Sequence, residues 1–300
     1  KNSYKVVSFK GAFYSTGDGK VRTYVAAPPV SLSNKADGVK ISWKKVAGGD
    51  AYYIYRKVSG GSYKKIKELS SAKTSYVDSS VSETSLYSYY VRAVYNGSAS
   101  SYEAVSIRRF GKVSVNLSNV SSGIKIKWSS VSRADGYYIY RRKASSDTYT
   151  RIASLKDGSR SSYTDKKAVN GTVYYYRVVP YSGKYVGTKA GGKSFVRLKR
   201  ASVYSVKVKG SSMITVKASR NSAASGYIIE VSRKKNFSEK EYINLAGSDN
   251  TMQSFKNLQA DHNYYVRIRS YKKYNGKTYY SAWSAKEKVR TEVDPNASLR

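Results

Sequence analysis

Two stretches of this chain carry the same residues in the same order, 85 positions apart. Residues 50–55 read Asp-Ala-Tyr-Tyr-Ile-Tyr and residues 135–140 read Asp-Gly-Tyr-Tyr-Ile-Tyr, while Trp43 and Trp128 precede them at matching positions. The match continues to Tyr87 and Tyr174, where the offset has grown to 87, so we expect two extra residues near positions 145–147. A repeated unit of about 90 residues predicts several small domains in tandem.

A third, more divergent copy follows over residues 214–268, with Ala218 where the other copies have tryptophan. We therefore predict three units, at residues 28–109, 110–198 and 199–292. Residues 4–9 match residues 176–181, so residues 1–27 are expected to be the terminal hairpin of a truncated preceding unit. Residues 293–300 are expected to form a tail or linker.

Each unit alternates apolar and polar residues with a period of two. Val39, Ile41 and Trp43 would face one side of a sheet, and Lys40 and Ser42 the other, which is the pattern of half-buried β-strands. Pairs such as Asn96-Gly97 between such runs are typical of hairpin turns. With no stretch of helical periodicity, the prediction is an all-β fold in which each unit is a seven-stranded β-sandwich.

The segment from Trp128 to Arg141 resembles the B–C segment of bacterial fibronectin type III modules. Tyr264, with Tyr87 and Tyr174 in the same place, resembles that family's tyrosine corner. The resemblance implies tandem fibronectin type III-like β-sandwiches, in which this tyrosine ties the crossover between strands E and F to nearby backbone. It also implies an extracellular location on a bacterial surface or secreted protein. Ala218 departs from the pattern, and Trp283 is a candidate to fill the volume.

Chemistry-bearing residues are scarce. The chain has no cysteine and a single histidine, His262, which excludes disulfides, thiolate metal sites and a histidine relay shared between units. Asp50, Asp78, Asp135 and Asp165 recur at matching positions and are interpreted as turn residues that bind backbone. We expect no catalytic, cofactor-binding or metal-binding residues, no cofactor and no enzyme activity.

Positive charge is the chain's most unusual property. Its 55 Lys and Arg against 19 Asp and Glu give a net charge of +36, spread over every unit. In the expected sandwich, the outer faces of strands C and F would carry tyrosine rings interleaved with arginines. The candidate residues of this face are Tyr53, Tyr55, Tyr90, Arg92, Tyr138, Tyr140, Tyr175, Arg177, Tyr181, Tyr265, Arg267, Arg269 and Tyr271.

Two interpretations of this face stay open. The pairs can stabilise an exposed sheet, or they can form a binding surface in which rings stack on sugars and cations neutralise acidic groups. For the second, the expected partners are an anionic polysaccharide, teichoic acid or a host surface protein. Nucleic acid is not expected, because no nucleic-acid-binding motif occurs.

The predicted function is that of non-catalytic extracellular spacer or adhesion modules, monomeric and cell-wall-associated or secreted. The alternative is an accessory, carbohydrate-binding or wall-binding region of an extracellular hydrolase. No apolar run in the sequence reaches the length of a bilayer span, so export and anchoring signals are expected outside this fragment.

Overall fold

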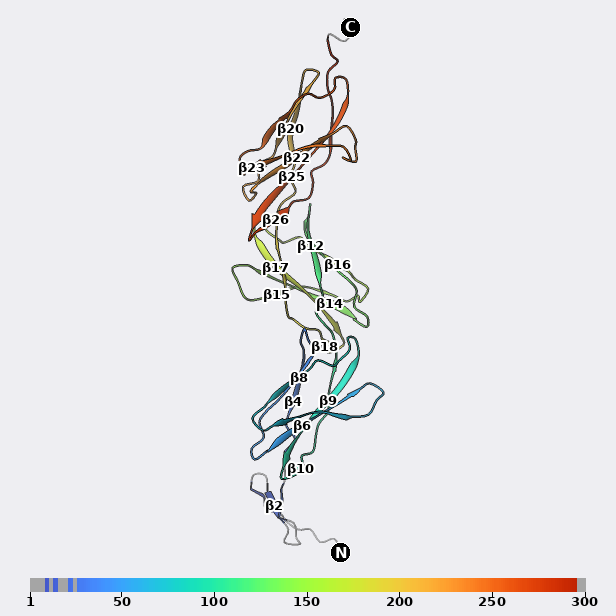
Figure 1. Ribbon diagram of the computed structural model, residues 1–300, viewed down its shortest axis with the longest axis vertical. Coiled ribbons are helices and arrows are strands. Elements are labelled where there is room, and N and C mark those ends of the chain that lie inside the picture. Colours follow the sequence, from blue (N-terminus) through green and yellow to red (C-terminus); the bar gives the residue numbers. More distant parts are fainter. Residues whose placement is uncertain (1–8, 11–12, 16–20, 24–25, 296–300) are drawn as a thin grey trace.

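The computed structural model describes residues 9–10, 13–15, 21–23 and 26–295, and this part of the chain contains strands and no helix. Figure 1 shows the strands gathered in successive groups along one long axis, from β2 at one end to β20 near the other. The first group is a small antiparallel sheet in the order β1-β2-β3, formed by β1 (Phe9–Lys10), β2 (Phe13–Ser15) and β3 (Val21–Thr23). The predicted strand over residues 4–9 lies mostly outside the described residues.

We call the units predicted at residues 28–109, 110–198 and 199–292 modules one, two and three. Module one is a sandwich of two antiparallel sheets. The first has the order β4-β5-β8. The second has the order β10-β9-β6-β7, with β11 also pairing with β9, so that its edge strand is broken into two pieces. The strands are β4 (Val30–Asn34), β5 (Val39–Trp43), β6 (Ala51–Val58), β7 (Lys64–Ser70), β8 (Ser75–Asp78), β9 (Leu86–Tyr95), β10 (Ser98–Ala99) and β11 (Val105–Arg108).

Module two repeats this pairing, with the sheet β12-β13-β16 against the sheet β15-β14-β17-β18, and β19 pairing with β17. Its strands are β12 (Val115–Val120), β13 (Gly123–Trp128), β14 (Gly136–Lys143), β15 (Thr150–Leu155), β16 (Ser162–Asp165), β17 (Val173–Ser182), β18 (Tyr185–Val186) and β19 (Lys193–Val196).

Module three has the same plan again, with sheets β20-β21-β24 and β23-β22-β25-β26, and β27 pairing with β25. Its strands are β20 (Val203–Lys209), β21 (Met213–Ala218), β22 (Gly226–Ser232), β23 (Glu241–Ala246), β24 (Met252–Phe255), β25 (Asn263–Tyr274), β26 (Lys277–Tyr280) and β27 (Glu287–Arg290). The predicted fold is confirmed: the chain is a tandem array of fibronectin type III-like β-sandwiches.

Each module has its own apolar core, built from the inward residues of both sheets. In β5, Val39, Ile41 and Trp43 are buried while the residues between them lie nearer the surface, as the alternation predicts. The indole of Trp43 lies 5.3 Å from the ring of Tyr52, and that of Trp128 lies 5.2 Å from the ring of Tyr137. The two matched tryptophans therefore occupy equivalent positions in separate cores.

The predicted tyrosine corner is present in all three modules. The hydroxyl oxygen of Tyr87 accepts a hydrogen bond from the backbone N–H of Ser82 at 2.9 Å. Tyr174 and Tyr264 make the same bond to the N–H groups five residues before them, at 3.1 and 2.8 Å. Each bond satisfies a loop N–H and fixes the crossover between the two sheets.

Two of the four recurring aspartates differ from the prediction. Asp78 and Asp165 do accept hydrogen bonds from nearby backbone, but their carboxylates are buried at the end of a strand. Each accepts a hydrogen bond from an arginine guanidinium and from a buried tyrosine hydroxyl, at 2.7–2.8 Å. The partners are Arg56 and Tyr89 for Asp78, and Arg141 and Tyr176 for Asp165. Each aspartate therefore belongs to a buried ion pair. A carboxylate inside a protein is stable only when it has such partners.

In module three the same three positions are apolar. Phe255 lies opposite Ile214 as Asp165 lies opposite Ile124, and Val231 and Val266 stand where Arg141 and Tyr176 stand in module two. The whole polar group has been exchanged together, which leaves no carboxylate or guanidinium without its partner.

The two additional residues of module two are not together near residues 145–147. Tyr55 pairs with Lys65 and Tyr140 with Arg151, which places one extra residue in the preceding turn. The second extra residue lies between β15 and β16. Each turn absorbs one residue, which keeps the inward and outward faces of β15 and β16 in place.

Candidate functional site

The joint between modules one and two is held by a buried asparagine at the end of β4. The side-chain amide of Asn34 donates one hydrogen bond to the carbonyl of Arg108 in its own module and another to the carbonyl of Val186 in module two, both at 2.9 Å. Its side-chain oxygen accepts a hydrogen bond from the N–H of Phe110 at 3.1 Å. One side chain thus joins two modules and the linker between them.

The second joint repeats these bonds with matching residues. Asn119 donates to the carbonyl of Val196 at 3.0 Å and across the joint to the carbonyl of Tyr280 at 2.9 Å, and accepts from the N–H of Leu198 at 2.9 Å. We call this arrangement, built on Asn34 and Asn119, the asparagine clamp. Its occurrence at both joints shows that the repeat includes the connection between modules as well as the modules.

A buried arginine fixes each linker beside the clamp. The guanidinium of Arg109 donates to the carbonyl of Phe110 at 2.7 Å and to that of Ala36 at 3.1 Å. Arg197 does the same with the carbonyls of Leu198 and Ser121, at 2.7 and 3.2 Å. Burial lowers the pKa of Arg197, so this cation is held in the joint by backbone carbonyls at a desolvation cost.

Apolar contact adds to the second joint. Val196, Leu198 and Tyr279 form a buried cluster that spans modules two and three, and the ring of Phe195 meets that of Tyr279 edge-on at 5.3 Å. At the far end of module three, Val208 lies opposite Ile214 as Asn119 lies opposite Ile124. The clamp residue is therefore replaced there by an apolar one.

The tyrosine and arginine face is best developed in module two. Arg142 lies 3.9 Å from the ring centroid of Tyr175, and Arg177 lies 3.3 Å from that of Tyr149. Lys189 lies 5.6 Å from the ring of Tyr140. The strands β14 and β17 bring these groups together because Tyr140 is paired with Arg177 and Arg142 with Tyr175. Each cation–π contact stabilises the sheet by about 0.5–1 kcal/mol.

Arg177 is fixed in this face. Its Nη1 donates to the carbonyl of Lys189, and its buried Nε has no hydrogen-bond partner. In the described part of module two, the one ion pair joins Arg141 to Asp165. The cations of the outer face therefore have aromatic partners and no carboxylate neutralising them.

Tyr138 and Tyr181 complete the module two face. Their rings stack at 4.4 Å, and Arg151 lies 4.8 Å from the Tyr138 ring. The Tyr181 ring also covers Gly136, where an added Cβ would be 2.6 Å from the tyrosine hydroxyl. The carbonyl oxygen of Leu155 is closer still, at 2.0 Å, so the backbone of β15 and the tyrosine ring together require glycine at this position.

In module one the predicted residues gather into a compact aromatic stack. Tyr90 is only 7% exposed, because its ring lies 4.6 Å from Tyr55, 3.8 Å from Tyr102 and 4.7 Å from Tyr63. The expectation of a solvent-facing ring is therefore wrong for Tyr90.

Tyr53 and Arg92 are the two remaining predicted residues of module one, and each has a partner of its own. Lys65 lies 4.2 Å from the ring of Tyr53, and the Nε of Arg92 donates to the carbonyl of Ser100 at 2.6 Å.

Module three presents a ladder of cations and rings centred on Trp283. Arg267 lies between Phe237 and Trp283, at 4.1 and 4.2 Å, and Arg269 lies between Trp283 and Tyr280, at 4.4 and 4.0 Å. Trp283 therefore lies on the outer face and does not fill the place of the missing core tryptophan.

The charges of this ladder are partly compensated. A nitrogen of Arg267 lies 2.6 Å from the buried carboxylate of Glu230, and burial lowers the pKa of Arg269. Tyr265 is half-buried beside Ser232 in register. Tyr271 is buried over Gly226, so the expectation of exposure is wrong for Tyr271 as well.

Sequence reasoning missed the partners supplied by loops and edge strands. Strands C and F of the sequence analysis are β6 and β9 in module one and β14 and β17 in module two. Tyr63, Tyr102 and Tyr149 lie outside these strands, and Trp283 follows β26. Their contacts join segments that sequence periodicity does not relate. The described residues contain no group of three His, Asp or Glu placed to hold a metal ion, and no helix long and apolar enough for a membrane crossing.

No family model matches the chain, and no curated protein matches it. Among solved structures, the chain is similar to the chicken CNTN1 FN1–FN3 domains, with 16% identity over 90% of this chain and 99% of that chain and a TM-score of 0.32. It is also similar to a two-domain fibronectin type III segment from chicken tenascin, with 16% identity over 58% and 99% and a TM-score of 0.29.

Proposed function

We propose that this chain is a non-catalytic spacer, a tandem array in an extracellular bacterial surface or secreted protein that holds its neighbouring domains apart. The asparagine clamp carries this proposal. A flexible linker would let neighbouring modules reorient freely, whereas here each linker is bonded to both modules through buried side chains.

The energies favour a stiff joint. Each buried hydrogen bond contributes about 0.5–1.5 kcal/mol net, and an amide left without its partners costs about 1–3 kcal/mol. Opening a joint would remove the bond from Asn34 to Val186, or from Asn119 to Tyr280, and at the second joint it would also expose the apolar cluster of Val196, Leu198 and Tyr279. Modules held end to end in this way give the extended arrangement visible in Figure 1.

Small-angle X-ray scattering of the whole chain tests the spacer function. The double variant Asn34→Ala with Asn119→Ala is compared with the wild type, and Asn116→Ala, an exposed residue of β12, is the matched control. We expect the wild type and control to scatter as one extended particle and the double variant to require a mixture of bent forms. A wild type that already requires such a mixture would overturn the spacer proposal.

A second function is favoured by the uncompensated cations of module two. The face formed by Arg142, Arg151, Arg177 and Lys189 has tyrosine rings between the charges and no carboxylate partner. Such a surface suits an anionic glycopolymer of the cell wall or of a host, since the rings can stack on sugars while the cations neutralise acidic groups.

Retention on immobilised teichoic acid and heparin at 150 mM salt tests this surface. We expect Arg142→Gln with Arg151→Gln to elute clearly earlier than the wild type. A control with Lys207→Gln and Lys209→Gln, which removes two charges from module three, should elute close to the wild type. Equal losses in the two variants would show attraction by net charge alone and would remove this face as a site.

An accessory region of an extracellular hydrolase is compatible with the same spacer. The two roles differ in what adjoins the array, and a catalytic domain encoded beside these modules would decide for the accessory role.

A further inference from the structure

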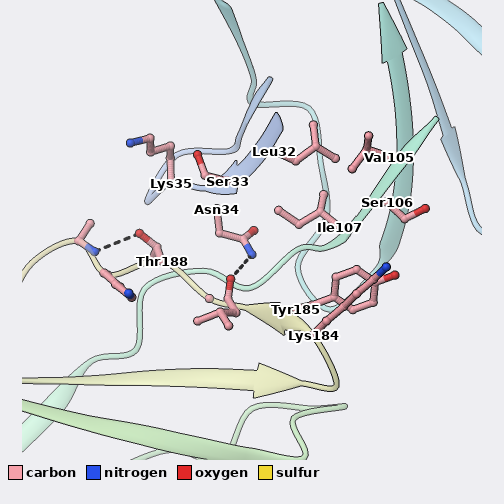
Figure 2. Close-up of a pocket in the computed structure, with 14 residues that line it drawn as sticks. Leu32, Ser33, Asn34, Lys35, Val105, Ser106, Ile107, Lys184, Tyr185 and Thr188 are labelled. Carbon is pink, nitrogen blue, oxygen red and sulfur yellow. Dashed lines mark hydrogen bonds between the residues drawn. The ribbon is translucent and has the colours of Figure 1, made fainter. Parts of the chain in front are cut away.

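The joint between modules one and two contains an open cleft of about 750 Å³. Figure 2 shows Leu32, Ser33 and Lys35 from β4 and its following turn and Val105, Ser106 and Ile107 from β11, with Lys184, Tyr185 and Thr188 contributed by module two. The cleft is therefore formed by two modules and exists only when they are docked. Its size falls within the range of ligand-binding pockets.

The second joint has the same design with larger side chains at two matching positions. Ile107 pairs with Tyr87 as Phe195 pairs with Tyr174, so the larger Phe195 stands where Ile107 stands. There the Phe195 ring packs against Tyr279, which is 9% exposed, whereas its counterpart Tyr185 is partly exposed. The first joint therefore has smaller apolar side chains than the second at matching positions of its lining.

The charges of the two joints differ as well. Lys35 follows Asn34 where Val120 follows Asn119, and Lys189 occupies the position of Trp283. Lys184 is the third lysine of the cleft, with its Nζ 5.7 Å from the Tyr185 ring. None of the three forms an ion pair in the described structure, and neither aspartate nor glutamate lines the cleft.

The remaining lining suits a sugar. Ser33 and Tyr185 supply hydroxyl groups that can donate or accept hydrogen bonds, as does Ser106, whose hydroxyl also bonds that of Ser88, and the partly exposed Tyr185 ring offers an apolar surface beside them. A simple anion such as phosphate would use the lysines and the hydroxyl donors and leave the Tyr185 ring without a role. Lysines, hydroxyls and one ring together match a chain of sugar rings that carry carboxylates.

We propose that this cleft binds an acidic oligosaccharide of the uronic acid class, which contacts modules one and two at once. The site shares Lys189 with the tyrosine and arginine face of module two but none of that face's arginines, and it rests on the docked joint of the proposed spacer. Because the ligand would bind the docked form alone, it would also stabilise the joint.

Isothermal titration of the whole chain with tetragalacturonate at 150 mM salt tests the site. Uncharged maltotetraose and inorganic phosphate are the comparison ligands. The cleft variant is Lys35→Gln with Lys184→Gln and Lys189→Gln, and the charge-matched control is Lys207→Gln with Lys209→Gln and Lys217→Gln. The face variant is Arg142→Gln with Arg151→Gln.

We expect saturable binding of one tetragalacturonate per chain, weakened about tenfold or more in the cleft variant and less than about twofold in the control and face variants. Maltotetraose and phosphate should bind far more weakly. Absence of binding at millimolar tetragalacturonate, or equal weakening in the cleft and control variants, would overturn the proposal. Weakening in the face variant alone would place the anion on module two and refute the cleft. The scattering experiment reports the docked joint separately, so loss of the cleft site is distinguishable from failure of the spacer.

Discussion

The buried Asp78 should make a large contribution to the stability of module one. Its carboxylate is 1% exposed and accepts hydrogen bonds from Arg56 and Tyr89, both at 2.8 Å, and from the hydroxyl of Ser80 at 2.7 Å. Burial, together with the hydrogen bond to this carboxylate, raises the pKa of Tyr89. The substitution Asp78→Ala removes the acceptor from all of these groups.

The expected cost follows from what is left behind. The hydroxyl of Tyr89 belongs to a fully buried residue and would lose its only hydrogen-bond partner, at about 1–3 kcal/mol. Arg56 would lose its ion pair, but its side chain is 24% exposed and can turn toward water. Breaking a fully buried ion pair costs about 3–5 kcal/mol. We therefore expect Asp78→Ala to lower the free energy of unfolding of module one by about 3 kcal/mol.

Urea unfolding followed by tryptophan fluorescence measures this change. Trp43 lies in the core of module one, so a background with Trp128→Phe and Trp283→Phe reports on that module. The control is Asp50→Ala, which removes an exposed carboxylate that accepts from the N–H of Asn96.

Module three supplies the decisive comparison. Arg56→Val with Asp78→Phe and Tyr89→Val copies its apolar version of the site, and we expect this triple variant to be more stable than Asp78→Ala alone. A loss below about 1 kcal/mol for Asp78→Ala, or a larger loss for the triple variant, would refute the reasoning.

Three further predictions concern single groups. Burial opposes ionisation of Asp78, but hydrogen bonds from Ser80, Arg56 and Tyr89 outweigh it and lower its pKa below 3.8. Its stabilisation is therefore present above pH 4 and is lost as the pH falls through the lowered pKa, so acid unfolding of module one should be less steep in Asp78→Asn. In module two, Tyr174→Phe leaves the N–H of Val169 without its acceptor and should lower the free energy of unfolding in urea by about 1–2 kcal/mol. An unchanged free energy of unfolding would contradict a role for the corner hydroxyl. At the second joint, Phe195→Ala should speed proteolysis within residues 197–202 several-fold, and an unchanged rate would show that its contact with Tyr279 does not close that joint.

The fold was predictable because its signals are local. Alternation over Val39, Ile41 and Trp43 defines a strand face within five residues, and the tyrosine corner joins groups five residues apart. The repeat then transfers each local assignment from one module to the next. Patterns and contacts within about five residues can be recognised in a single sequence.

The buried carboxylates were not predictable from their own surroundings. Asp165 has turn residues on one side, and its partners Arg141 and Tyr176 come from two other strands. The available signal was a comparison between copies, because the third copy replaces all three residues with apolar ones. Simultaneous exchange of a charge and its partners indicates contact.

The joints between modules could not be predicted from the sequence for a related reason. Asn34 and Asn119 look like ordinary polar residues at strand ends, and their role depends on a carbonyl of the next module. Their recurrence at matching positions, beside the recurring Arg109 and Arg197, was the one signal in the sequence. The tyrosine and arginine faces were predicted for strands C and F, but the rings that bury Tyr90 come from elsewhere in the chain.

The stiffness of a single joint is the most direct test of the account. The chain has no cysteine, so Ser62→Cys in module one and Ser145→Cys in module two, both exposed, accept spin labels at two defined places. Double electron–electron resonance between these labels should give one narrow distance distribution, which broadens when Asn34→Ala is added. A broad distribution in the labelled chain with Asn34 intact would contradict a joint held by the asparagine clamp, and with it the spacer function.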